Sequence, residues 1–196
     1  MTTANKITVF RILLIPFFIT QMLYYMANGE EWHRLLALVS FALAAISDGV
    51  DGYIARKYDQ KSELGAVLDP LADKLLLVSA IIVLALDRSA HFPPVPLWFP
   101  AVILSRDILL LIGLAVIHYM AGRVKIRPHF TGKTATVLQM AVVVWALLQW
   151  NRSVLDWLML FAALFTAVSG LIYILSGMHF LGASPSSSAG QKDSNG

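Results

Sequence analysis

The chain has 196 residues, of which 58% are hydrophobic and 14% are charged, and its mean hydropathy is +0.69. A soluble domain carries about 25% charged residues, so this composition excludes an ordinary water-soluble protein and indicates a membrane protein. The net charge of +3 forms no basic stripe, which makes nucleic acid a poor partner. Because cysteine is absent, disulfides and thiolate metal sites are excluded, whereas metals that prefer oxygen ligands are not.

Six apolar segments are long enough to cross a bilayer, which takes about 20 residues per crossing. The first contains Pro16, which a membrane helix can accommodate as a kink, and no small-residue cleavage site follows it. The sequence therefore predicts an all-α, polytopic membrane protein with six transmembrane helices. We expect them near residues 7–27, 34–55, 66–86, 96–120, 133–150 and 154–180.

The last residues differ in composition from the rest of the chain. Residues 182–196 are small, polar and rich in serine, and such a segment buries too little apolar surface to fold. We therefore expect one six-helix transmembrane domain over residues 1–181 and a disordered cytoplasmic tail over 182–196.

Basic residues are unevenly distributed among the connectors. Because lysine and arginine are enriched in cytoplasmic loops, the connectors after the second and fourth segments, and with them both termini, are expected in the cytoplasm. These two connectors hold Arg56, Lys57, Lys61, Arg123, Lys125 and Arg127, whereas the other three hold Arg34, Arg88 and Arg152. The five tryptophans fall mostly near segment ends, where we expect them to anchor the protein at the membrane interface.

Four aspartates lie at or beside apolar segments. Asp48 and Asp51 are near the end of the second segment, and Asp69 and Asp73 are near the start of the third. Spacings of three and four residues place each pair on one helix face. Charges near hydrocarbon are costly and usually mark a site, and four converging carboxylates repel one another unless hard cations such as Mg²⁺ neutralise them. The sequence therefore predicts a metal site on the cytoplasmic side.

Small residues and an arginine accompany the aspartates. Gly52, Ala55 and Gly65 would let a bulky ligand approach the backbone, although glycines also serve helix packing. Arg56 carries a guanidinium suited to phosphate. Carboxylates, small residues and an arginine together suit a metal-bound diphosphate, and a carboxylate that the metals do not fully use could deprotonate a hydroxyl.

Eight positions with fixed gaps over 26 residues match, without departure, the signature of the CDP-alcohol phosphotransferases. The resemblance covers residues 5 to about 180 and implies the six-helix fold of that family, with the site facing the cytoplasm. The signature positions are Asp48, Asp51, Gly52, Ala55, Arg56, Gly65, Asp69 and Asp73.

The resemblance also implies a role for each position. The four aspartates would bind two Mg²⁺ ions, with Mn²⁺ equally suited to oxygen ligands, and Asp73 would also activate the acceptor hydroxyl. The other four positions would line the CDP pocket. The implied reaction is attack of an alcohol oxygen on the β-phosphorus of a CDP-lipid such as CDP-diacylglycerol, with release of CMP. Relatives are homodimers, so a homodimer in the cytoplasmic (inner) membrane is expected.

The acceptor is suggested by basic residues on the cytoplasmic side. Arg106 lies inside the fourth segment and either pairs with a carboxylate such as Asp107 or binds an anion. Lys133 at a helix start and Arg127 are further candidates for a phosphate on the acceptor, although basic connectors also serve orientation.

Flanking motifs resemble bacterial phosphatidylglycerophosphate synthases, which implies glycerol 3-phosphate as the acceptor. SRDILLLIG at 105–113 is at least as similar to the eukaryotic-type cardiolipin synthases, whose acceptor is phosphatidylglycerol, and inositol phosphate is a third option. The flanking motifs are Asn5-x-Ile7-Thr8-x-x-Arg11 and Gly132-Lys133-x5-Gln139-Met140.

The first of these motifs leaves alternatives open. Asn5 and Thr8 could reach the nucleotide or could cap a helix. Arg11 could extend to the membrane interface instead of facing the site.

The main alternative from another class is a cation transporter with an acidic intramembrane site. The absence of an internal repeat, the cytoplasmic position of the motif and Arg56 among the acids argue against it. A catalytically inactive scaffold is disfavoured because every motif carboxylate is present.

Overall fold

The structure is a computed structural model that describes the backbone of residues 3–58, 63–89, 91–121 and 130–182, and the side chains of 9–47, 72, 74–89, 91–113 and 131–175. Within these ranges the chain forms six α-helices and no strand, which confirms the predicted all-α fold. The helices are α1 (Thr3–Asn28), α2 (Glu31–Tyr58), α3 (Glu63–Leu86), α4 (Trp98–Ala121), α5 (Phe130–Leu148) and α6 (Arg152–Gly182).

The helices follow the predicted segments closely and differ from them mainly at the ends. Glu31 begins α2, three residues before the predicted start, and its carboxylate is favourable at the positive end of the helix dipole. The fourth helix begins at Trp98, after Pro94 and Pro96, because proline disfavours helical backbone in the residue before it. The residues predicted to form the tail lie almost entirely outside the described part of the chain.

Three of the helices contain described stretches that are long and apolar enough to cross a membrane. These stretches are Val9–Asn28, Thr131–Leu148 and Arg152–Leu175, and a shorter apolar stretch, Lys74–Leu86, lies in α3. A helix satisfies all its backbone hydrogen bonds internally, as a segment in hydrocarbon must. The chain is therefore an all-α membrane protein.

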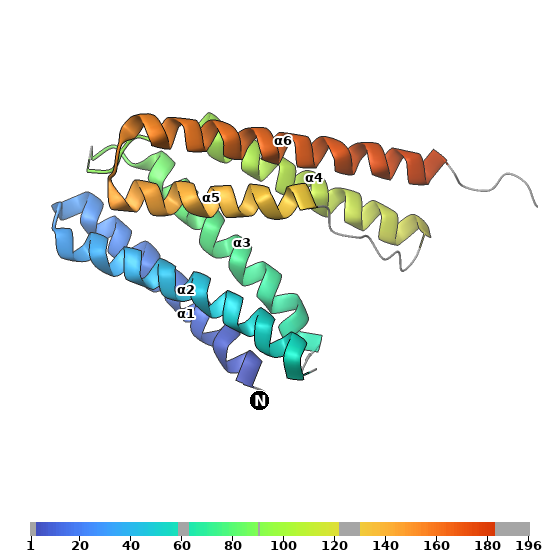
Figure 1. Ribbon diagram of the computed structural model, residues 1–196, viewed down its shortest axis with the longest axis horizontal. Helices are drawn as coiled ribbons and strands as arrows, with labels where there is room; N and C mark the ends of the chain where they lie inside the picture. The colour runs from blue at the N-terminus through green and yellow to red at the C-terminus, as the bar shows by residue number, and fades with distance from the viewer. Residues whose placement is uncertain (1–2, 59–62, 90, 122–129, 183–196) are drawn as a thin grey trace, which may run out of the picture.

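α1 and α2 form an antiparallel pair, α5 and α6 form a second antiparallel pair that α4 joins by packing along α6, and α3 runs between the two groups (Figure 1). α1 packs along α2, α5 packs along α6, and α3 contacts α1 on one side and α4 and α5 on the other. The connectors at residues 29–30, 87–97 and 149–151 meet at one end of the bundle, which we call the closed end (Figure 1). Toward the opposite, open end the helices diverge; there α2 ends and α3 begins, and α4 ends and α5 begins (Figure 1).

Hydrogen bonds join helix ends and connectors at the closed end. The Gln149 side-chain amide donates to the Tyr25 hydroxyl and to the His91 carbonyl, at 2.6 Å each. Arg34 Nη1 donates to the Leu147 carbonyl at 2.9 Å, which ties α2 to the end of α5. Gly29 closes the α1–α2 turn with a φ of 69°, and this left-handed backbone lets it lie directly against the His91 ring.

The tryptophans gather near the closed end. Trp145 donates its indole N–H to the Asn151 carbonyl at 3.1 Å and contacts the Trp150 ring edge-on. Indole rings favour the boundary between hydrocarbon and water, so their placement supports a membrane interface at this end. The exposed members are Trp32, Trp98, Trp150 and Trp157.

We expect Gly29→Ala to destabilise the fold. The added Cβ would lie 2.5 Å from His91 Nε2, and a left-handed alanine costs about 1–3 kcal/mol. The thermal unfolding midpoint in detergent should fall clearly below that of the unmodified protein. In the Gly29→Ala/His91→Ala double variant the clash is gone, so part of the loss should return, and an unchanged midpoint in the single variant would contradict the packing described here.

Candidate active site

The inward face of α3 leads directly to two of the predicted site residues. Leu76, Ala80 and Leu84 are buried along this face. Positions 73 and 69 lie three and seven residues before Leu76, so they continue the same face toward the open end. Asp69 and Asp73 therefore occupy inward positions of the α3 backbone, although their side chains lie outside the described part of the chain.

The inward face of α2 continues in the same way to the first aspartate pair. Ala37, Phe41 and Ala44 are buried along it. Asp48 and Asp51 follow Ala44 by four and seven residues, which keeps them on that face. The remaining signature positions are placed by their backbone alone, and they are Gly52, Ala55 and Arg56 on α2 and Gly65 on α3.

The two aspartate pairs thus lie on adjoining ends of consecutive helices. The end of α2 and the start of α3 lie near each other at the open end of the bundle (Figure 1). Among the described side chains no group of three or more histidine, aspartate or glutamate residues could hold a metal. The signature aspartates have oxygen donors that suit hard cations, and they are the metal ligands that the sequence predicts.

The inward face of α1 adds a buried arginine to this region. Arg11 has none of its surface exposed and lies on one stripe with Ile15 and Phe18. The expectation that Arg11 could extend to the membrane interface is therefore wrong, because the side chain lies between the helices. Thr8 precedes Arg11 by three residues and lies near its face, whereas Asn5, six residues before Arg11, lies about 120° around the helix; neither side chain is among the described ones.

A second polar group lies within the membrane helices, on α4. Arg106 Nη1 donates to Asp107 Oδ1 at 2.9 Å, so the pairing that the sequence left open is present. Lys74, the residue after Asp73 on α3, donates to both carboxylate oxygens of Asp107 at 2.7 Å each. Two cations thus share one carboxylate, which leaves a formal charge of +1 on this cluster.

Small residues of α5 and α6 surround the Arg106 side chain. Arg106 Nη2 donates to Ser169 Oγ at 3.0 Å. A Cβ on Gly132 would lie 2.9 Å from Nη2, and a Cβ on Gly170 would lie 3.3 Å from the Arg106 Cγ. Arg106 Nε is buried and has no hydrogen-bond partner in the described part of the chain. The guanidinium is therefore held in one place, and its Nε–H is not used by these contacts.

The structure says less about Lys133 and Arg127, the other two residues predicted to bind the acceptor. The Lys133 side chain is exposed, one residue from Gly132 on α5. Arg127 lies outside the described residues.

A buried pair next to the arginine cluster links α5 to α6. Gln139 Nε2 donates to Thr166 Oγ1 at 2.8 Å, and Thr166 donates in turn to the Ala162 carbonyl at 2.6 Å. Both side chains are buried. Gln139, a residue of the second flanking motif, therefore lies beside the face of α6 that carries Thr166 and Ser169.

The structure adds three residues that the sequence analysis did not assign to the site. They are Lys74, Asp107 and Ser169, which all contact one another or Arg106. Lys74 and Asp107 are charged residues inside apolar runs, and this signal could have marked them. Ser169 carries no such signal, because a serine is common in membrane helices.

Comparison with known proteins supports the signature. The sequence profile described as CDP-alcohol phosphatidyltransferase matches residues 1–168. Three relatives share the name CDP-diacylglycerol–glycerol-3-phosphate 3-phosphatidyltransferase. That of Shigella flexneri is 30% identical over 171 residues, or 86% of this chain and 90% of the relative. That of Escherichia coli is 30% identical over 141 residues, covering 72% and 74%. That of Pseudomonas fluorescens is 38% identical over 128 residues, covering 65% and 60%.

The profile covers most of the chain, and one relative is matched over nearly its whole length. The profile and the relative agree with the signature, whose aspartates continue the inward faces of α2 and α3. The chain belongs to the CDP-alcohol phosphatidyltransferase family.

Proposed function

We propose that this enzyme transfers a phosphatidyl group from CDP-diacylglycerol to glycerol 3-phosphate, releasing CMP and forming phosphatidylglycerophosphate. The observation that carries the proposal is the ion-pair cluster formed by Lys74, Arg106 and Asp107. Its Lys74 belongs to α3, the helix that also bears Asp69 and Asp73. The relatives named above act on the same two substrates, as their name states.

The metal site would be formed by the four signature aspartates. Members of this family generally use a divalent metal. We assign two Mg²⁺ ions to Asp48, Asp51, Asp69 and Asp73, since the donors are all oxygen and the chain has no thiolate to favour a softer metal. Bound there, the ions would offset the charge of the donor diphosphate and polarise its β-phosphorus.

Asp73 would act as the general base of the transfer. Its carboxylate takes the proton of the acceptor hydroxyl as the acceptor oxygen forms a bond to the β-phosphorus. The bond from that phosphorus to the oxygen bridging to CMP breaks, and CMP leaves with the electron pair. Gly52, Ala55, Arg56 and Gly65, with Asn5 and Thr8 on α1, would line the CDP side of the site.

Arg106 would hold the phosphate of the acceptor. Its buried Nε–H lacks a partner in the described part of the chain, and the cluster around it keeps an excess positive charge. Hydrogen bonds from a guanidinium to phosphate are among the stronger ones in proteins. Lys133 and Arg127 would contribute further positive charge near the membrane surface.

The open end of the bundle would face the cytoplasm of a bacterial cell, in the inner membrane. The basic connectors of the sequence belong to this end, and the exposed tryptophans belong to the closed end. We further propose that the protein acts as a homodimer.

Product analysis tests the proposed acceptor. Purified protein in Mg²⁺-containing buffer is given CDP-diacylglycerol with glycerol 3-phosphate, phosphatidylglycerol or inositol phosphate, and CMP release and lipid mobility on a thin-layer plate are measured. We expect phosphatidylglycerophosphate from the first mixture and its loss when a chelator removes the metal. Cardiolipin from the second mixture instead would identify a cardiolipin synthase, and absence of CMP release from all three would contradict an enzyme of this class.

Asp73→Asn should abolish turnover while leaving donor binding largely intact. The amide keeps the size of the side chain but cannot accept the hydroxyl proton, so kcat should fall by about 100-fold or more. CMP release measures turnover, and equilibrium binding of CDP-diacylglycerol measures the donor site. Asp156→Asn, on an exposed residue of α6 near the closed end, is the control and should keep full activity. Normal turnover in the Asp73 variant would remove this residue as the base.

Arg106→Ala should raise the KM for glycerol 3-phosphate more than the KM for CDP-diacylglycerol. Loss of a charged hydrogen bond costs about 1.5–3 kcal/mol, which corresponds to roughly 10-fold or more. Gly132→Ala should give the same pattern more weakly, because its Cβ would displace Nη2. In an Arg106→Ala background, Gly132→Ala should add little. Equal changes in both KM values would indicate a purely structural arginine.

A further inference from the structure

Asp107 is the point where two cations from different helices meet. Its Oδ1 accepts from Lys74 Nζ of α3 at 2.7 Å and from Arg106 Nη1 of its own helix at 2.9 Å. The exposed fractions are 14% for the Asp107 side chain, 12% for Arg106 and 37% for Lys74. The carboxylate is thus largely enclosed, and Lys74 approaches it from the more open side.

The contact between Arg106 and Asp107 is unusual for neighbours in a helix. Residues one apart point about 100° away from each other, so their side chains do not ordinarily meet. Here the two side chains meet, and each also has a partner on another helix. Arg106 Nη2 donates to Ser169 Oγ of α6, and Asp107 Oδ2 accepts from Lys74 Nζ of α3. The convergence depends on partners from α3 and α6, and therefore on how these helices are placed.

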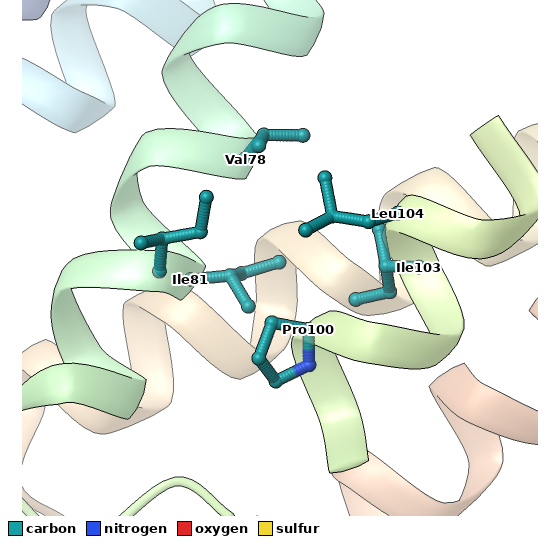
Figure 2. A pocket seen from close by; sticks show the side chains of 6 residues that line it. Val78, Ile81, Pro100, Ile103 and Leu104 are labelled. Carbon is teal, nitrogen blue, oxygen red and sulfur yellow. The ribbon is translucent and has the colours of Figure 1, made fainter. Parts of the chain in front are cut away.

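Toward the closed end from this ion pair, apolar side chains of α3 and α4 face one another. They border a narrow apolar hollow that has no room for a water molecule, and Figure 2 shows side chains from both helices pointing into it. Val78 is four residues after Lys74, and Leu104 is three residues before Asp107, so the hollow begins about 6 Å from the ion pair. It is lined by Val78, Ile81, Ile82, Pro100, Ile103 and Leu104.

Apolar burial favours contact between α3 and α4 but is non-directional, so it does not by itself fix one position of the two helices along each other. The Lys74–Asp107 pair joins the same helices one turn away, and its hydrogen bonds require a particular distance and direction. Near the open end, the placement of α3 against α4 therefore depends on this pair.

We infer that Asp107 is a positioning residue, which fixes the helix bearing Asp69 and Asp73 against the helix bearing Arg106. This inference rests on the proposed function, in which α3 supplies the base and α4 binds the acceptor phosphate. Asp107 acts through Lys74 and Arg106 and does not itself touch substrate. Because a displacement of about 1 Å can cost roughly 100-fold in rate, a loosened α3–α4 contact lowers catalysis without removing any catalytic group.

The test compares Lys74→Met, Asp107→Asn and Lys74→Arg. Lys74→Met removes the hydrogen bonds between α3 and α4 but leaves the charges of Arg106 and Asp107 paired with each other. Lys74→Arg keeps a bond between the two helices. We expect kcat to fall by about 10- to 100-fold in the first two variants, with the KM for CDP-diacylglycerol within about 2-fold, and Lys74→Arg to retain most activity. Asp156→Asn breaks an exposed pair with Arg152 at the closed end and serves as the control.

A distance measurement separates positioning from stability alone. The chain has no cysteine, so Leu75→Cys and Ile112→Cys, both on exposed positions of α3 and α4, can carry spin labels without background. Electron paramagnetic resonance should show a shifted or broader distance distribution in the Lys74→Met and Asp107→Asn variants, and an unchanged one in Lys74→Arg and in the control.

Either of two results would overturn the inference. One is an unchanged distance distribution in Lys74→Met and Asp107→Asn, whatever their activity. The other is a changed distribution with unchanged kcat. Failure of the proposed function appears separately, as a wild-type protein that does not use glycerol 3-phosphate; the kinetics are then measured with the acceptor that it does use, and the distance measurement needs no substrate.

Discussion

The charge cluster between α3 and α4 depends on one carboxylate. Asp107 accepts hydrogen bonds from Lys74 and Arg106, so a single negative charge pairs with two positive ones inside a bundle of apolar helices. An isolated charge is costly in such surroundings, and truncation of one partner in a buried pair is strongly unfavourable. Through Ser169 and Gly132 the same cluster contacts α6 and α5. Four of the six helices, α3 to α6, therefore contact one set of charges.

The two ends of the bundle divide structural and chemical tasks. At the closed end, Gln149 and Arg34 join connectors that are distant in sequence, and the aromatic side chains pack against one another. At the open end the inward faces of α1, α2 and α3 change from apolar to polar positions. Burial stabilises the apolar part of each face, while the polar part lies where the helices diverge (Figure 1). One continuous helix face can thus serve as core at one depth and as site at another.

The sequence predicted the helices well because apolar length is a direct physical requirement of a membrane span. The aspartate set stays a prediction, which rests on fixed helical spacing and on the inward backbone positions of α2 and α3. The contacts of Arg11, Lys74 and Ser169 could not be predicted in the same way. Whether Arg11 faces lipid or protein depends on the rotation of α1 against its neighbours. Lys74 and Asp107 are 33 residues apart in sequence, and they make contact only because α3 packs against α4. The residue pattern within one helix determines neither the rotation of that helix nor the neighbour against which it packs.

A site rich in carboxylates would need nearby cations to accept an anion. The signature aspartates belong to α2 and α3, and the described excess of positive charge comes from Lys74 on α3, since Arg106 and Asp107 of α4 offset each other. In the proposed reaction, metal ions would neutralise the aspartates and the donor diphosphate, but a phosphorylated acceptor would bring further negative charge. Arg106 can lower that cost only if it is not consumed by its own counter-ion. Asp107 Oδ1 accepts from both Lys74 and Arg106, and Arg106 donates to it through Nη1, so the ion pair holds the guanidinium without using its Nε–H.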